Sequence, residues 1–241
     1  MPKAYVLIPA GGVGSRMASA GRPKQFLPVA GKPILAHTMG AFDRHPGIDS
    51  LVVVCRPGDE TEIESLARRF GIGKAICFAA GGDTRQLSVR NGLLAMGAFA
   101  RENDIVLVHD GARPLVSPQI ISQNIEGAAR QGAVTTALPA RDTILYGEDP
   151  QSISAVLDRR KLYTIQTPQS FRFGIISQAH RNAYESGEYD STDDGSLFLR
   201  HGGGHPLGIV EGSPLNFKIT VEEDLRLMEA LLASRDCQTK A

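Results

Sequence analysis

Residues 4–16 of the chain read AYVLIPAGGVGSR, a short apolar segment followed at once by a glycine-rich turn. The apolar part, residues 4–9, carries no charge, which is typical of a strand that a parallel sheet buries on both faces. Glycines directly after such a strand let backbone N–H groups approach phosphate oxygens without obstruction by a Cβ atom. This segment therefore predicts an α/β fold with an anion-binding turn at the end of its first strand.

The rest of the chain continues this alternation of apolar, β-branched segments and longer amphipathic ones. Strands are predicted at residues 4–9, 50–55, 74–78, 104–109 and 133–138, and helices at 33–44, 59–70, 86–100, 118–130, 174–186, 193–201 and 221–233. This order predicts a single domain over residues 1–241, with a mostly parallel, Rossmann-like sheet and helices on both faces. Ligands of such folds bind beyond the carboxyl ends of the strands, so we expect function in the loops at 10–25, 81–85 and 110–114.

Residues 141–160 interrupt the alternation. Two short strand-like segments, 141–146 and 153–157, flank the turn signal GEDP at 147–150, and no helix follows to cover them. This pattern predicts a β-hairpin that projects from the domain as an arm. We expect the arm to form a homodimer, and an exposed hairpin on a monomer is the alternative.

The composition is that of an ordinary globular chain. Lys plus Arg and Asp plus Glu both number 26, so the formal net charge is zero, which argues against non-specific nucleic-acid binding. The apolar runs are strand-sized and the start of the chain lacks the apolar region of a signal peptide, so we expect no membrane span and a cytoplasmic location. The widely spaced Cys55, Cys77 and Cys237 favour free thiols in a reducing compartment.

Two cations follow the glycine turn, in a segment that has no acidic residue before Asp43. Arg16 offers a planar fork to phosphate oxygens and Lys24 a compact point charge, so together they suit a triphosphate. In nucleotidyl transfer an enzyme mainly positions groups and neutralises charge on the phosphorus oxygens and the leaving group. A tight surface turn with solvated cations is the alternative interpretation.

The turn lacks two common nucleotide-binding motifs. The Walker A pattern G-x-x-x-x-G-K-[ST] is absent, and Met17 stands where G-x-G-x-x-G needs its third glycine. A dinucleotide fold also needs an acidic residue after the second strand, where this chain has Cys55 and Arg56. A dinucleotide-dependent oxidoreductase is therefore a disfavoured alternative.

With Arg16, Pro23, Lys24 and Gln25 in place, the chain resembles the glycine-loop sugar-phosphate nucleotidyltransferases, and within them the 2-C-methyl-D-erythritol 4-phosphate cytidylyltransferase family. The resemblance runs in the same order through blocks at 8–17, 23–27, 81–92, 108–114, 141–143, 158–171, 192–197 and 216–225. It implies transfer of CMP from CTP to 2-C-methyl-D-erythritol 4-phosphate in isoprenoid precursor synthesis, with Mg²⁺ or another divalent cation and release of pyrophosphate.

The resemblance also implies roles for single residues. Arg16 and Lys24 would be the catalytic cations at the α-phosphorus of CTP. The nucleotide would be held by Ala10, Gly11, Gly12, Gly14, Gly82, Asp83 and Ser88. Asp110 would be the metal ligand, and the sugar phosphate would be surrounded by Asp110, Arg113, Thr143, Arg159, Thr167, Thr192 and Lys218. Thr143 and Arg159 would reach a neighbouring subunit's site. The family usually has alanine where this chain has Gly11 and Gly111.

From the residues alone, some of these positions have structural alternatives. Asp83 or Thr84 suits a helix cap and Asp110 a turn, while Arg85 and His109 are interpreted as structural. Residues 216–220 are predicted as a strand that runs into a helix capped by Thr220 and Glu223.

Two further functions stay open. A ribitol 5-phosphate cytidylyltransferase would share the glycine turn and the Pro-Lys-Gln block. The segments LDR at 157–159 and TDDGSL at 192–197 favour methylerythritol phosphate over it. A non-catalytic nucleotide-binding module is disfavoured because Arg16, Lys24 and Asp110 are all present.

Overall fold

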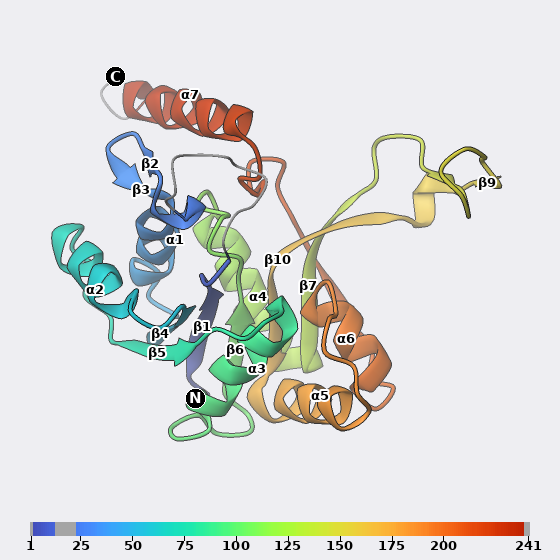
Figure 1. The fold of residues 1–241 in the computed structure, drawn as a ribbon, viewed down its shortest axis with the longest axis horizontal. Helices are drawn as coiled ribbons and strands as arrows, with labels where there is room; N and C mark the ends of the chain where they lie inside the picture. Colours follow the sequence, from blue (N-terminus) through green and yellow to red (C-terminus); the bar gives the residue numbers. More distant parts are fainter. Residues whose placement is uncertain (1, 13–22, 239–241) are drawn as a thin grey trace.

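The computed structural model describes residues 2–12 and 23–238. They include a seven-stranded sheet with the strand order β11-β7-β10-β6-β1-β4-β5 (Figure 1). Its strands are β1 (Ala4–Pro9), β4 (Ser50–Cys55), β5 (Ile76–Ala80), β6 (Ile105–Val108), β7 (Ala133–Pro139), β10 (Tyr163–Arg172) and β11 (Gly208–Glu211). β10 runs antiparallel to its neighbours β6 and β7, whereas the other neighbouring strands are parallel. The predicted mostly parallel α/β fold is confirmed.

Alternate side chains of the central strand β1 enter two separate cores, because successive side chains of a strand point to opposite faces. Val6 and Ile8 pack in a core with α1 (Ile34–Asp43), α2 (Glu60–Arg69) and α4 (Pro118–Gln131). Tyr5 and Leu7 pack in the other core with α3 (Arg85–Met96), α5 (Phe173–Glu185) and α6 (Asp194–His201). Helices therefore cover both faces of the sheet, as the apolar strands predict.

Two strands of the sheet, β10 and β11, were not predicted from the sequence. β10 carries polar side chains that are fully buried, Gln169 and Ser170, and its pairing with β7 shifts register between Ile165 and Gln169. Gln169 Nε2 donates to Thr135 Oγ1 at 3.1 Å, and Ser170 Oγ donates to Asn124 Oδ1 at 2.9 Å. Since tertiary partners satisfy these groups, the strand lacks the apolar pattern on which sequence prediction depends.

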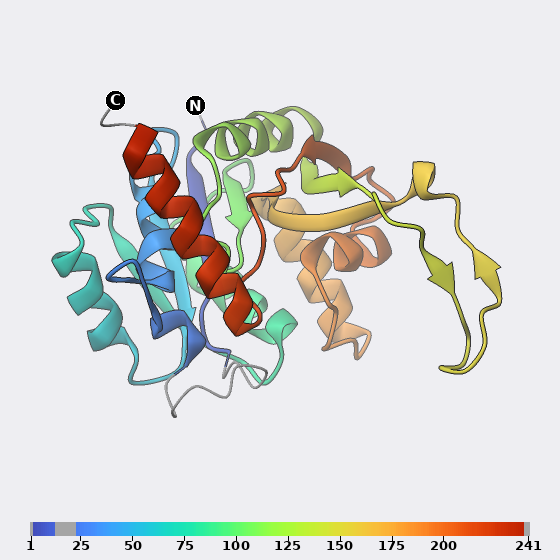
Figure 2. The same cartoon turned by 90° about the horizontal axis from the view of Figure 1, so that it is seen from above.

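A third, smaller core lies under α7 (Glu222–Gln238) and includes Val29, Ile34, Leu115, Ile219 and Met228 (Figure 2). It also receives the short hairpin of β2 (Pro28–Val29) and β3 (Lys32–Pro33). The packing holds the chain just before α7 against the carboxyl edge of the sheet, where Ile219 N donates to Ala112 O at 2.8 Å.

The prediction for residues 216–220 was wrong in two respects. These residues form no strand, and the acidic residue at the start of α7 that binds Thr220 is Asp224 rather than Glu223. Asp224 Oδ2 accepts hydrogen bonds from Thr220 N at 2.6 Å and from Thr220 Oγ1 at 2.9 Å. The carboxylate one position later reaches both groups, so the S/T-x-x-E spacing was misleading here.

The predicted arm is confirmed. β8 (Leu145–Tyr146) and β9 (Ala155–Val156) pair antiparallel, and every residue from 141 to 160 is exposed. Figures 1 and 2 both show the hairpin extending away from the sheet on the far ends of β7 and β10. Among residues 2–12 and 23–238, no helix combines the length and the apolar character needed to cross a membrane.

Candidate active site

A cavity of about 530 Å³ opens where the parallel strands β1, β5 and β6 end. The three loops expected to carry function all contribute to its wall, together with the segment before α7. Its lining residues are Pro9, Ala10, Gly11, Gly12, Lys24, Gln25, Gly82, Asp83, Thr84, Arg85, Ser88, Asp110, Gly111, Ala112, Lys218 and Thr220. The described residues of the strand-end loops that were expected to carry function therefore line one common cavity.

The loop after β1 is tied to the sheet at its start. Ala10 N donates to Val54 O at 2.7 Å, and the buried Gln25 donates from Nε2 to Ala10 O at 2.6 Å. Gln25 was not singled out as a site residue, although the Pro-Lys-Gln block contains it. Gly14 and Arg16 lie outside the described residues, so their predicted roles stay predictions.

Lys24 lies at the border between this loop and the segment before α7. It begins a short 3₁₀ turn (Lys24–Phe26), and its Nζ donates to Ile219 O at 2.9 Å. This contact places the ammonium group beside Lys218 and Thr220, on the wall of the cavity. The predicted catalytic cation therefore faces the same space as the glycine loop.

The loop between β5 and α3 is shaped by Gly82 and Ser88. A Cβ atom at Gly82 would lie 2.6 Å from the Cβ of Leu87, so only glycine fits this turn. Ser88 Oγ accepts from Gly82 N at 3.0 Å and donates to Thr84 O at 2.9 Å. Thr84 caps α3 by accepting from Leu87 N at 3.1 Å. The cap expected for Asp83 or Thr84 is thus made by Thr84, and the exposed Asp83 faces the cavity.

Three cations surround the carboxylate of Asp110. Lys218 Nζ lies 3.0 Å and Arg113 Nε 3.4 Å from Oδ2, while Arg85 Nε lies 3.4 Å from Oδ1. Burial on its own would raise the pKa of Asp110, but the charges of Arg85, Lys218 and Arg113 outweigh it and hold the pKa below its usual range. Since Asp110 stays ionised and the cations outnumber it, the cluster is suited to an additional anion.

Behind Asp110, His109 and Thr167 form a buried chain of hydrogen bonds. A carbonyl oxygen can only accept, so the contact of 3.0 Å between His109 Nε2 and Arg113 O assigns the proton to Nε2. His109 Nδ1 then accepts from Thr167 Oγ1 at 3.2 Å, and Thr167 Oγ1 accepts from Asp110 N at 3.1 Å. The hydroxyl hydrogen of Thr167 is therefore used inside the protein. The Thr167 hydroxyl oxygen could therefore only accept a further hydrogen bond, from a donor group of a ligand.

Of the predicted substrate residues, Asp110 and Lys218 line the cavity, whereas Arg113 and Thr167 contact Asp110 without forming part of the wall. The other three lie further away. Thr143 and Arg159 lie on the exposed arm, where Arg159 Nη1 donates to Arg141 O at 2.9 Å. Thr192 is exposed on the loop that leads into α6. The structure thus brings together the nucleotide loops, Lys24, Asp110 and Lys218, and leaves these three positions at the periphery of one chain.

The carboxylates on the cavity wall are Asp110 and Asp83. Nowhere in residues 2–12 and 23–238 do three or more His, Cys, Asp or Glu side chains gather in a way that could hold a metal ion. Mg²⁺ is commonly held by one or two carboxylates together with substrate phosphates. The donor set therefore fits a divalent ion that arrives with a triphosphate, and does not fit a metal cage built by the protein alone.

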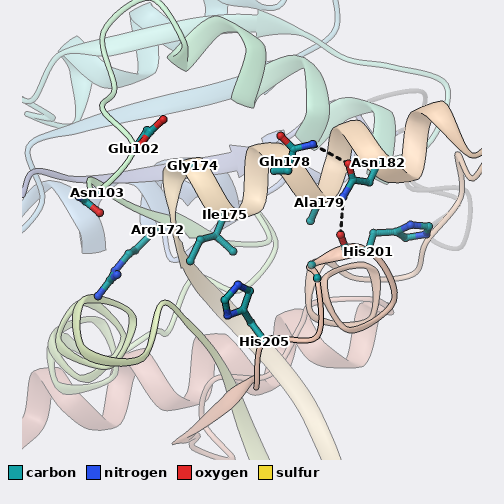
Figure 3. Close-up of a pocket in the computed structure, with 12 residues that line it drawn as sticks. Glu102, Asn103, Arg172, Gly174, Ile175, Gln178, Ala179, Asn182, His201 and His205 are labelled. Carbon is teal, nitrogen blue, oxygen red and sulfur yellow. Dashed lines mark hydrogen bonds between the residues drawn. The ribbon is translucent and has the colours of Figure 1, made fainter.

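A second cavity of about 420 Å³ lies at the opposite ends of the strands, where β10 ends and α5 begins (Figure 3). Its wall includes Arg172, which donates from Nη2 to Ala129 O at 2.7 Å. Gln178 donates to Asn182 Oδ1 at 2.7 Å, and Asn182 donates to His201 O at 3.0 Å. These polar groups bind one another or the backbone, and none of the described residues of the three strand-end loops lines this cavity.

The fold and the cavity together define an α/β protein with a cluster of cations at the carboxyl ends of its parallel strands. The family model of 2-C-methyl-D-erythritol 4-phosphate cytidylyltransferase matches residues 4–234. The chain belongs to this family.

Relatives and solved structures agree with this membership. The chain is 44% identical to the 2-C-methyl-D-erythritol 4-phosphate cytidylyltransferase of Syntrophotalea carbinolica, with 95% of each chain covered. It is also 38% identical to the ribitol-5-phosphate cytidylyltransferase of Streptococcus agalactiae, with 94% of each covered. The crystal structure of 4-diphosphocytidyl-2C-methyl-D-erythritol synthase from Anaerococcus prevotii superposes with a TM-score of 0.83, at 29% identity and 96% coverage of each chain.

Proposed function

We propose that this protein transfers CMP from CTP to 2-C-methyl-D-erythritol 4-phosphate and releases pyrophosphate. The observation that carries the proposal is the cationic cluster around Asp110, which shares one cavity with the glycine loop and Lys24. Membership of the family supports the identity of the base and of the acceptor.

The chemistry needs no covalent bond to the protein. A phosphate oxygen of the acceptor attacks the α-phosphorus of CTP, and the bond from this phosphorus to the oxygen bridging to the β-phosphate breaks, so that pyrophosphate leaves. The nucleophile is already ionised at neutral pH, and the protein positions the two phosphates and neutralises charge. Lys24 and Arg16 would act at the α-phosphate, while Lys218 and Arg113 would bind the phosphate of the acceptor.

We further propose that Mg²⁺ enters with CTP and is held by Asp110, with Asp83 beside the nucleotide. When bound, the ion would neutralise part of the triphosphate charge. Because Arg85, Arg113 and Lys218 already compensate Asp110, the free protein would bind the metal weakly.

A homodimer through the arm would complete the acceptor site. The arm exposes Ile153 and Val156 at 62% and 67%, and its own two-stranded sheet covers neither. Thr143 and Arg159 lie on this arm and line no part of the cavity of their own chain. Their predicted role therefore requires a second copy. We also infer a reducing, cytoplasmic environment, which the free Cys55 and Cys77 support.

Pyrophosphate release in a matrix of nucleotides and acceptors tests the proposal. CTP with 2-C-methyl-D-erythritol 4-phosphate should give the highest kcat/KM. A preference for ribitol 5-phosphate would instead support the second candidate, which the relative from Streptococcus agalactiae favours. CTP binding without turnover on either acceptor would indicate a non-catalytic nucleotide-binding module.

A further inference from the structure

Arg85 is a largely buried cation that joins the two halves of the cavity. It is the first residue of α3, directly after the loop that holds Gly82 and Asp83. Its Nε lies 3.4 Å from Asp110 Oδ1, and its Nη1 lies 2.8 Å from Asp194 Oδ2, with 22% of the side chain exposed. One guanidinium group therefore bridges a carboxylate of the site and a carboxylate of α6.

Asp194 is a rigid anchor for this bridge. Its side chain is 1% exposed, and the Nε2 atom of His180 lies 3.2 Å from its Oδ1. The backbone N of Asp194 donates to Gln169 Oε1 at 2.9 Å, which fixes the start of α6 to β10. A second tie joins the loop just before α6 to α3, since Ser191 N donates to Gln86 Oε1 at 2.6 Å. The starts of α3 and α6 are thus locked together, and Arg85 has little freedom to move.

The two oxygens of Asp110 have different partners. Oδ2 pairs with Lys218 and Arg113, the cations proposed for the acceptor phosphate, whereas Oδ1 pairs with Arg85. Arg113 Nη1 also donates to Asn216 O at 2.8 Å, which leaves its Nη2 group for a ligand. A carboxylate can pair with two cations through its two oxygens at once. If Oδ1 lost its own cation, the group could turn and bind Lys218 and Arg113 with one oxygen each. Those cations would then be less available to the substrate.

We infer that Arg85 is a positioning residue for the acceptor: by holding Oδ1 of Asp110, it keeps Lys218 and Arg113 on Oδ2 alone, so that their remaining N–H donors stay available to the acceptor's phosphate. The inference rests on the proposed function. Arg85 is expected to affect binding of the acceptor rather than binding of CTP, because the residue acts through Asp110 and its two cationic neighbours. A merely structural role would change stability without this selectivity.

Steady-state kinetics of Arg85→Gln, with each substrate varied in turn, test the inference. The KM for 2-C-methyl-D-erythritol 4-phosphate should rise on the order of tenfold or more, with a much smaller change in the KM for CTP. Arg85→Lys should restore part of the loss, because it keeps the charge but cannot bridge both carboxylates. Arg172→Gln is the matched control, an arginine that binds a backbone carbonyl at the opposite ends of the strands, and it should leave both KM values unchanged.

A double variant separates an effect on acceptor binding from an effect on folding. Arg85→Gln leaves Asp194 buried without its guanidinium partner, whereas Arg85→Gln with Asp194→Asn removes both charges. The double variant should fold and still show the raised acceptor KM. Wild-type kinetic constants in the double variant, or a lower Tm with an unchanged acceptor KM, would overturn the inference while leaving the proposed function intact. A wild type without turnover on this acceptor would overturn both.

Discussion

The ammonium group of Lys24 donates a hydrogen bond to the carbonyl oxygen of Ile219 at 2.9 Å, across 195 positions of the chain. The contact joins the loop that follows the first strand to the segment that precedes the last helix. It places Lys24 next to Lys218, which faces Asp110. The proposed nucleotide and acceptor sides of the cavity therefore meet at this pair.

Lys24→Ala should lower kcat far more than it weakens CTP binding. Removal of one donor that stabilises charge in the transition state typically costs roughly 10²–10³ in rate. Pyrophosphate release gives kcat, and calorimetric titration gives the Kd of CTP. Lys74→Ala is the control, since Lys74 Nζ also donates to a backbone carbonyl, that of Asp43. Near-normal turnover of Lys24→Ala would remove this residue from the catalytic role.

The two glycines that replace the family's usual alanines should respond differently to restoration of the methyl group. A Cβ at Gly11 would have its nearest neighbour at 3.8 Å, an ordinary contact, whereas at Gly111 it would lie 3.1 Å from Pro9 O. We expect Gly11→Ala to be neutral or stabilising by up to about 1 kcal/mol. Gly111→Ala should destabilise by about 1 kcal/mol, because the strand end must shift. Urea unfolding of both variants measures this, and equal effects would contradict it.

The stability of the protein should fall between pH 6.5 and pH 4 partly because of His109. Burial lowers the pKa of His109 to about 4, against an ordinary value of about 6.5. Since the unfolded chain takes up this proton and the folded one does not, stability rises with pH across this window and is lost as pH falls. The shift corresponds to about 3 kcal/mol at most.

Urea unfolding of His109→Gln at several pH values isolates this contribution. Burial also lowers the pKa of His37 and His45, so the wild type carries further pH dependence in the same direction. The difference between wild type and variant should shrink as pH falls from 7 to 4. His205→Gln, at an exposed histidine, serves as control. A difference that is constant with pH would show that folding leaves the pKa of His109 unshifted.

A charge on the arm should dissociate the proposed homodimer. Val156 is 67% exposed and pairs with Leu145 across the hairpin, so Val156→Asp would place a carboxylate in the proposed contact. Light scattering at low micromolar concentration should show a dimer for wild type and a monomer for the variant, with a loss of turnover.

The control for Val156→Asp places the same charge elsewhere on the surface. Leu94→Asp introduces the same group at a position that is 61% exposed on α3, and it should leave mass and turnover unchanged. A wild type that scatters as a monomer would refute the dimer.

The position of the site could be predicted, but its inner contacts could not. The glycines at 11 and 12, Asp110 and Lys24 each follow a strand or a loop that the sequence identifies, so their convergence at one sheet edge was foreseeable. Arg85 was interpreted as structural, because a lone arginine near a helix start resembles any surface cation. The nearest signal was its place between Gly82 and Ser88, two predicted nucleotide residues.

The amino-acid sequence by itself determined five of the six parallel strands, the covering helices and the exposed arm, because hydrophobic periodicity and turn residues act over a few neighbouring positions. Only the tertiary structure decided that β10 enters the sheet antiparallel with buried polar groups, and that Asp194 and Lys218 meet Arg85 and Asp110. Such contacts join residues that are distant in the chain. Whether they form depends on how all the elements pack, and no local pattern records that.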